Sequence, residues 1–203
     1  MRVKRKSVED AILRAAEQEF IENGYQKATV SKIARRAGIS PANVYVYFQS
    51  KLEVVLAVYA PWFRSQILDL EQDVDRQPER GMKLTKLVEG LWIKIPHDED
   101  SLTRTLMQAL ATAKPNERYS PELLMWAEQK IAVILRRALG RDREPEEKFL
   151  PLAHMIMFAF DGVSLRHNLH QPLNRETCMI PTFVQMLLSL ADAPKVSTPN
   201  PAA

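Results

Sequence analysis

The sequence predicts an all-α protein in which an N-terminal three-helix helix-turn-helix unit precedes a larger helical domain, about nine helices in total. Three observations carry this prediction. Apolar residues recur at intervals of three and four through most of the 203 residues, glycines and prolines interrupt that pattern at helix-length intervals, and no stretch alternates as a strand does. With 46% hydrophobic and 26% charged residues, the composition is that of an ordinary globular protein.

The first helix is expected to start at Ser7 and to end at Gly24. Its apolar stripe consists of Val8, Ile12, Ala15, Ala16 and Phe20. Residues 1–6 form a short basic arm. Two interpretations of this arm are equally open: a solvated tail, or an arm that touches DNA phosphates or the minor groove.

The stretch from Thr29 to Lys51 has the helix-capping and turn residues of a helix-turn-helix. Thr29 is a suitable N-cap, and Gly38 suits the left-handed conformation that ends a short helix. Ser40 then caps a second short helix with Pro41 at its first position, where the missing N–H costs nothing. Two short helices around a glycine turn predict a DNA-binding element whose second helix enters the major groove.

The pattern AxxAGISxxxVYxYFxSK between Ala34 and Lys51 resembles, without a gap, the DNA-binding signature of TetR-family transcriptional regulators. The resemblance covers about the first quarter of the chain, one small domain. It implies a homodimer with a DNA-binding domain, here residues 1–51, and a helical ligand-binding and dimerisation domain, here residues 52–192. Residues 193–203 are proline-rich and poor in apolar side chains, which predicts a disordered tail.

Positive charge is concentrated in the helix-turn-helix part. Residues 1–51 hold ten Lys or Arg against five Asp or Glu, a net charge of +5, whereas residues 52–203 hold 18 against 20, a net charge of −2. A basic surface is what binding to DNA phosphates requires, although basic N-termini are common in other proteins as well.

The larger domain is predicted to contain helices over 51–74, 81–95, 97–113, 120–140, 146–169 and 173–191. Pro61 is expected to kink or break the first of them, because proline removes a backbone donor and clashes with the preceding turn. If that helix is continuous, we expect it to be the only rigid element that joins the basic module to the rest.

The expected DNA-binding side chains combine base readers and phosphate contacts. In the recognition helix, Asn43 carries the donor and acceptor that suit adenine, while Ala42 and Val46 suit thymine methyl groups. The resemblance implies phosphate contacts for Tyr45, Tyr47 and Lys51; packing in the core is the alternative for one tyrosine. The full set is Thr29, Lys32, Ser40, Pro41, Ala42, Asn43, Tyr45, Val46, Tyr47 and Lys51.

Aromatic and methionine side chains of the larger domain have two interpretations. The resemblance implies an apolar ligand pocket, whereas the same residues would also fill an ordinary core. An aspartate within an apolar helix needs a partner, which makes Asp161 a pocket group or a helix contact. The candidate ligand-binding residues are Trp62, Phe63, Trp92, Met107, Trp126, Phe158 and Asp161.

The last two helices are strongly apolar. By the resemblance, two such helices from each of two subunits form a four-helix dimer interface, and a dimer suits a palindromic operator. The candidate interface residues are Leu152, Met155, Ile156, Ala159, Val163, Phe183, Met186, Leu187 and Leu190.

Several classes of site are not expected. His167 with His170, and His97 with the acidic residues 98–100, lack a full metal-ligand set, so neither a metal nor another cofactor is predicted. Cys178 is the only cysteine, which excludes an internal disulfide, fits a reducing cytoplasm and suggests an inert core position. No apolar run reaches the roughly 18 residues of a membrane helix.

These features predict a cytoplasmic, homodimeric DNA-binding regulator. More specifically, we expect a repressor that a hydrophobic small molecule releases from a palindromic operator. Its partners would be double-stranded DNA, a second copy of the chain and that effector. One alternative is a ligand-independent regulator whose larger domain serves only dimerisation or a protein partner. Another is a helical enzyme with a vestigial DNA-binding module, for which the sequence offers no catalytic constellation.

Overall fold

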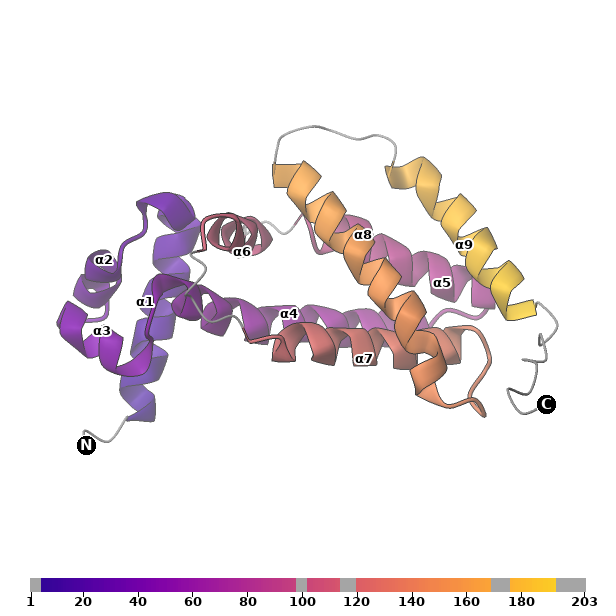
Figure 1. The fold of residues 1–203 in the computed structure, drawn as a ribbon, viewed down its shortest axis with the longest axis horizontal. Coiled ribbons are helices and arrows are strands. Elements are labelled where there is room, and N and C mark those ends of the chain that lie inside the picture. Colours follow the sequence, from indigo (N-terminus) through magenta and orange to yellow (C-terminus); the bar gives the residue numbers. More distant parts are fainter. Residues whose placement is uncertain (1–4, 98–101, 114–119, 169–175, 193–203) are drawn as a thin grey trace, which may run out of the picture.

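The computed structural model describes residues 5–97, 102–113, 120–168 and 176–192, and these contain nine α-helices and no strand. The all-α prediction is therefore confirmed for the described chain (Figure 1). Most of the basic arm, the acidic residues 98–100, His170 and the proline-rich tail lie outside the described residues.

Three helices and the start of a fourth form the N-terminal unit, at the left of Figure 1. They are α1 (Lys6–Lys27), α2 (Val30–Arg36), α3 (Pro41–Tyr47) and α4 (Lys51–Asp75). Gly24 has φ 68° and ψ 169°, so regular helical geometry in α1 ends there. The side chains that hold the unit together are fully or almost fully buried: Ile12, Ala16, Phe20, Ile33, Val44, Phe48 and Leu52.

Helix α4 runs without interruption through Pro61 for 25 residues, so the expected break is wrong. Pro61 lies on the exposed side of the helix, where water can take over the carbonyl that the missing N–H leaves without a donor. The buried side of α4 carries apolar side chains from Leu52 to Val74, and their burial holds the helix together across the proline.

Helix α5 (Arg80–Glu89) continues into a π-helical turn, η1 (Gly90–Lys94). A Cβ at Gly90 would come within 2.7 Å of Leu70 Cδ2 and still closer to Cδ1. Only glycine therefore lets this turn approach α4 so closely. The π turn places Trp92 in the core, where its Nε1–H donates to the carbonyl of Ile156 at 3.3 Å.

The remaining elements are α6 (Leu102–Ala111), α7 (Glu122–Ala138), a short 3-10 turn η2 (Glu146–Phe149), α8 (Leu150–Asn168) and α9 (Glu176–Asp192). Helix α7 packs on α4 and α8, and α9 packs on α5. Glu71 of α4 accepts from Lys130 at 2.8 Å and from Arg137 at 2.7 Å, both of α7. Charge pairing thus reinforces the apolar contact between α4 and α7.

Helix α4 is not the only link between the two parts of the chain. Helix α6 packs against α1 as well as against α4 and α8, and Figure 1 shows it lying beside the N-terminal unit. The expectation that α4 alone joins the module to the larger domain is therefore wrong. The sequence pattern of α6 shows which side is apolar but not which helices cover it.

The stretch Glu146–His167 has 22 residues and is long and apolar enough to cross a membrane by length and composition alone. A run of that kind was not expected from the sequence. In the structure this stretch packs on α6, α7 and η1, and Ala153, Ile156 and Phe160 are buried there. A core helix of a helical bundle accounts for the composition.

Candidate DNA-binding surface

Side-chain caps and a glycine turn build the helix-turn-helix. Thr29 Oγ1 accepts from the Lys32 amide at 3.2 Å, and Ser40 Oγ accepts from the Asn43 amide at 3.3 Å. Gly38 has φ 70°, and the amide of Ile39 donates back to the carbonyl of Ala34 at 3.0 Å. Local hydrogen bonds of these kinds satisfy the helix ends and set the angle between α2 and α3.

Helix α3 presents one face outward. Pro41, Ala42, Tyr45 and Val46 are exposed, with Tyr45 at 56% and Val46 at 38%, while Val44 is 1% exposed and packs inward. Large exposed apolar or aromatic side chains on a short helix cost hydration energy unless a partner covers them. The outward face therefore has the composition of a surface that meets another molecule.

Asn43 and Tyr47 flank this face and are half-buried. The hydroxyl oxygen of Tyr47 accepts from the Arg5 amide at 3.0 Å, which joins the end of α3 to the start of α1. For the tyrosines, the alternatives were packing in the core and contact with DNA. The Tyr45 side chain points to solvent, whereas the Tyr47 hydroxyl is hydrogen-bonded to the backbone of Arg5.

The ammonium group of Lys51 is bound within the protein. Its Nζ donates to the carbonyl oxygens of Tyr25 at 2.8 Å and Ala28 at 3.0 Å. It also lies 3.7 Å from the centroid of the Tyr25 ring. Two of the three ammonium donors thus fix the connection between α1 and α2 to the start of α4, a structural function that the sequence analysis missed.

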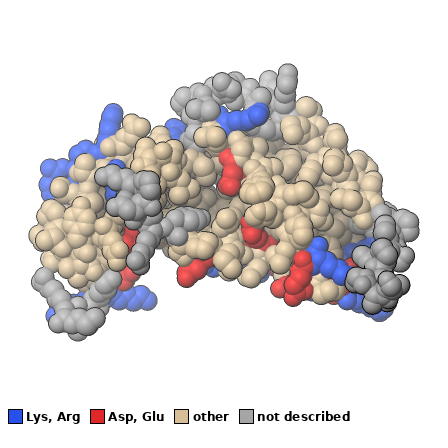
Figure 2. All heavy atoms as spheres, in the orientation of Figure 1, with Lys and Arg blue, Asp and Glu red and all other residues tan. Residues whose placement is uncertain are grey.

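Lys32 and Arg36 of α2 are paired with acids of α1. Arg36 forms hydrogen bonds with both Glu19 and Glu22, and Lys32 Nζ lies 3.8 Å from Glu19 Oε1. The hydrogen bond from Arg36 lowers the pKa of Glu22, and the same bond raises the pKa of Arg36. Of the basic side chains near the recognition helix, Lys27, Arg35 and Arg36 are exposed, Arg36 in spite of its ion pairs. Figure 2 shows several Lys and Arg side chains on this end of the molecule.

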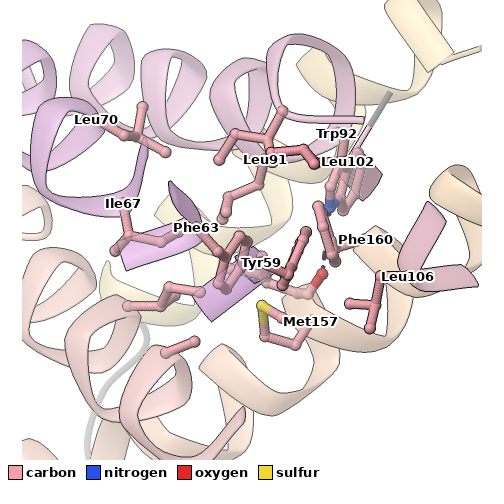
Figure 3. Packing of buried hydrophobic residues seen from close by; sticks show 14 of the residues in the cluster. Tyr59, Phe63, Ile67, Leu70, Leu91, Trp92, Leu102, Leu106, Met157 and Phe160 are labelled. Atoms are coloured by element: carbon pink, nitrogen blue, oxygen red, sulfur yellow. Dashed lines mark hydrogen bonds between the residues drawn. The ribbon is translucent and has the colours of Figure 1, made fainter. Parts of the chain in front are cut away.

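The candidate ligand residues do not lie together. Figure 3 shows Phe63, Trp92 and Phe160 converging in the core, with the Phe63 and Phe160 rings 5.7 Å apart. Trp62, Met107 and Trp126 are half-buried, and Trp126 lies under Arg64. Phe158, however, is 63% exposed, and Asp161 is also exposed. Both lie on the outer side of α8, so their grouping with buried Phe63 and Trp92 is wrong.

Asp161 has a charged environment of its own. Although the residue is exposed at the surface, neighbouring atoms remove part of the water around its carboxyl group; this desolvation, and then the negative charge of Glu128, raise the pKa of Asp161. Glu128 itself pairs with His154 Nδ1 at 2.5 Å, and the His154 ring lies 4.3 Å from that of Phe158. Within the described residues no group of three or more His, Cys, Asp or Glu could hold a metal ion.

The candidate interface residues divide between core and surface. Ile156 and Leu187 are 0% and 1% exposed within their own chain, so their assignment to a surface is wrong. Leu152, Ala159, Val163 and Phe183 are half-buried, and Met155, Met186 and Leu190 are exposed. Exposed apolar residues that the sequence analysis did not assign to this face are Phe158, Leu165 and Met179. Cys178 is exposed too, contrary to the expected core position.

An open apolar groove lies along α9, lined by Thr182, Gln185, Met186, Ser189 and Leu190. Met155, Phe158 and Leu165 occupy the outer side of α8 at helical spacing. Figure 2 shows a largely uncharged surface at the upper right, where Figure 1 places α9, and several acidic and basic side chains nearer the middle of the view. Because α8 is apolar on nearly every side, its sequence carries no signal that singles out this outer stripe.

The chain is similar to known regulators through its N-terminal part. The family model described as bacterial regulatory proteins, tetR family, matches residues 12–58. The fatty acid metabolism regulator protein of Bacillus subtilis (strain 168) is 30% identical over 77 residues, which cover 38% of this chain and 40% of the relative. The transcriptional activator FasR of Mycolicibacterium smegmatis is 33% identical over 87 residues, which cover 43% of this chain and 40% of the relative. The matched segments thus span less than half of either relative.

A solved structure extends the likeness to the whole fold. The transcriptional regulator FadR from Bacillus subtilis, in complex with stearoyl-CoA, aligns with a TM-score of 0.56 at 20% identity and covers 90% of this chain and 97% of that one. At this identity the likeness shows the fold alone. The helical arrangement beyond the helix-turn-helix is therefore shared, whereas the ligand is a property of that protein.

Proposed function

Because the chain is a TetR-family transcriptional regulator, we propose that it is a cytoplasmic homodimer that binds a palindromic operator and represses transcription until a hydrophobic small molecule releases it. The relatives and the solved structure are regulators rather than enzymes, so the helical-enzyme alternative is set aside. The outward face of α3 carries the proposal, because Ala42, Tyr45 and Val46 are exposed there on a rigidly capped helix.

Base reading is assigned to Ala42, Asn43 and Val46, and positioning on phosphates to Tyr45 and the exposed basic side chains around the helix-turn-helix. One recognition helix of seven residues contacts few base pairs. Two copies on a twofold axis would double that contact, and the apolar outer sides of α8 and α9 support such a pairing.

Control by a ligand would use both links between the two parts of the chain. A ligand that favours one arrangement of the larger domain would shift α4 and α6, both of which contact α1. The shift in DNA affinity can be no larger than the ligand's differential affinity for the two arrangements. Stearoyl-CoA is a reasonable first probe, since a solved structure of the same fold contains it.

A ligand-independent regulator is the second candidate. It is favoured by the close packing of Phe63, Trp92 and Phe160 in the core and by the outward position of Phe158 and Asp161. Thermal shift measurements with acyl-CoAs and other apolar ligands separate the two candidates. A dose-dependent rise in Tm that also weakens DNA binding supports control by a ligand, and no rise with any compound supports the second candidate.

Fluorescence anisotropy tests the function directly. The DNA is the segment immediately upstream of the protein's own gene, and the control is a shuffled duplex of equal composition at physiological salt. Binding tighter by about a thousandfold to the native segment is the expected result for a specific regulator. Equal, salt-sensitive binding to both duplexes, followed by a genome-wide search without a preferred site, would contradict it.

A further inference from the structure

Glu19 of α1 is a buried charged side chain, 3% exposed, beneath the helix-turn-helix. One carboxylate oxygen accepts from Asn23 Nδ2 at 3.0 Å and lies 3.8 Å from Lys32 Nζ. The other accepts from Arg36 Nη2 at 3.2 Å. A buried carboxylate requires partners of this kind, and two of the three are the basic side chains of α2.

Both basic side chains are held on the α1 side by further bonds. Lys32 Nζ donates to the carbonyl of Lys27 at 2.9 Å, and Arg36 also binds both carboxylate oxygens of Glu22. Helix α2 has seven residues, of which only Ile33 and Ala34 are buried. So short a helix with so little apolar contact depends on other interactions for its orientation.

We propose that Glu19 is a positioning residue for the recognition helix: its buried carboxylate draws Lys32 and Arg36 onto α1, which fixes α2 and α3 and withholds both cations from DNA phosphates. Orientation passes from α2 to α3 because the turn between them is closed by the bond from Ile39 to Ala34 at 3.0 Å. The positioning of α2 and α3 is argued from geometry alone. The withholding of Lys32 and Arg36 from phosphates rests on the proposed DNA-binding function.

The positioning of α2 and α3 and the withholding of the two cations predict different experimental results. Loss of the Glu19 charge should loosen α2 and α3 in the protein without DNA. It should also free the half-exposed Lys32 ammonium from its ion pair with Glu19, and each new phosphate contact steepens the dependence of log K on log salt by about 0.9. Specific contacts would weaken while non-specific affinity rises, so discrimination between sequences would fall.

Glu19→Gln is the test variant, because glutamine keeps the size and an acceptor oxygen but not the charge. Glu17→Gln is the matched control, since Glu17 is exposed on the same helix. Amide hydrogen exchange of α2 and α3 is measured without DNA. Exchange about tenfold faster than wild type is expected for Glu19→Gln, as for the loss of a charged hydrogen bond, and no change for Glu17→Gln. If Glu19→Gln does not fold, Glu19→Asp replaces it: the shorter side chain moves the carboxylate away from Lys32 and Arg36, so the same faster exchange is expected.

Salt titration of a shuffled duplex gives the second readout. Lys32→Ala should leave the salt slope of the otherwise wild-type protein unchanged and lower that of Glu19→Gln by about 0.9 per subunit. Unchanged exchange in α2 would overturn the positioning function, and an equal slope change in both backgrounds would overturn the withholding of Lys32. The absence of DNA binding by the wild type would refute the proposed function instead, and the exchange measurement would still decide on positioning.

Discussion

The Nζ of Lys51 lies 2.8 Å from the carbonyl oxygen of Tyr25 and 3.7 Å from the centroid of the ring of the same residue. This contact joins residues 26 positions apart and closes the N-terminal unit between the end of α1 and the start of α4. Lys51 therefore has a structural function, and a phosphate contact by the same side chain, which the sequence predicts, is separable from it by experiment.

Lys51→Ala is expected to destabilise the protein by about 1.5–3 kcal/mol, the range for hydrogen bonds to a charged group. Urea unfolding measures this change, and Lys27→Ala, which removes an exposed lysine of α1, should shift the midpoint little. On DNA, the salt slope decides whether Lys51 also contacts phosphate. A slope that falls by about 0.9 per subunit supports a contact, and an unchanged slope with weaker binding assigns the lysine to structure alone.

Asn43→Ala is expected to reduce discrimination between the operator and a single-base variant by about 1–3 kcal/mol, because a bidentate contact to a base would be lost. Competition binding with a set of operators changed at one base pair at a time measures the loss. The reduction should be confined to one position in each half-site. An equal loss of affinity for every duplex would show that Asn43 supports the fold of α3 rather than reads a base.

Gly90→Ala is expected to destabilise the protein by about 1–3 kcal/mol, because the new methyl group collides with buried Leu70. Gly81→Ala in α5 is the control, since its Cβ would meet only Leu188 Cδ1 at an ordinary 3.9 Å. In a double-mutant cycle, Gly90→Ala should cost less once Leu70→Ala has made room. Additive effects in that cycle would contradict the close approach of η1 to α4.

Glu71 is expected to make the folded protein sensitive to acid. Burial opposes ionisation of Glu71, but hydrogen bonds and charge from Lys130 and Arg137 outweigh it, and its pKa is lowered from 4.5. The stabilisation is therefore fully present above the ordinary pKa and is lost as the pH falls through the lowered one. Glu71→Gln should be less stable than wild type at neutral pH, and the difference should shrink below about pH 4.5. Thermal unfolding across this range, with exposed Glu122→Gln as control, measures it.

Phe158→Arg is expected to weaken self-association by at least about thirtyfold, because a large exposed aromatic side chain on the outer side of α8 is typical of a binding hot spot. Analytical ultracentrifugation measures the dissociation constant. Ile21→Arg changes an apolar residue of the N-terminal unit that is 44% exposed and should leave the constant unchanged. The assignment of α8 to an interface would be wrong if the wild-type protein sediments as a monomer. It would also be wrong if the variant dimerises as well as the wild type.

Local chemistry made the helix-turn-helix predictable. The caps at Thr29 and Ser40 and the glycine at position 38 act through bonds within a few residues, so the sequence alone determines the helix ends and the turn. The all-helical architecture followed in the same way from the helical spacing of apolar residues and from the glycines and prolines that interrupt it. The identity of the outward side chains of α3 also followed, because the inward stripe of so short a helix leaves only one other face.

Tertiary packing decided the rest. Helix α8 is apolar on nearly every side, so its sequence could not tell that Ile156 faces the core and Phe158 the solvent. Lysine and glutamate side chains are long and flexible, so only the folded chain shows that Lys51 turns back onto Tyr25 and that Glu19 is buried against α2. Pro61 lies within an unbroken helix because its position faces water, and which face of α4 meets water depends on helices that join it from distant parts of the chain.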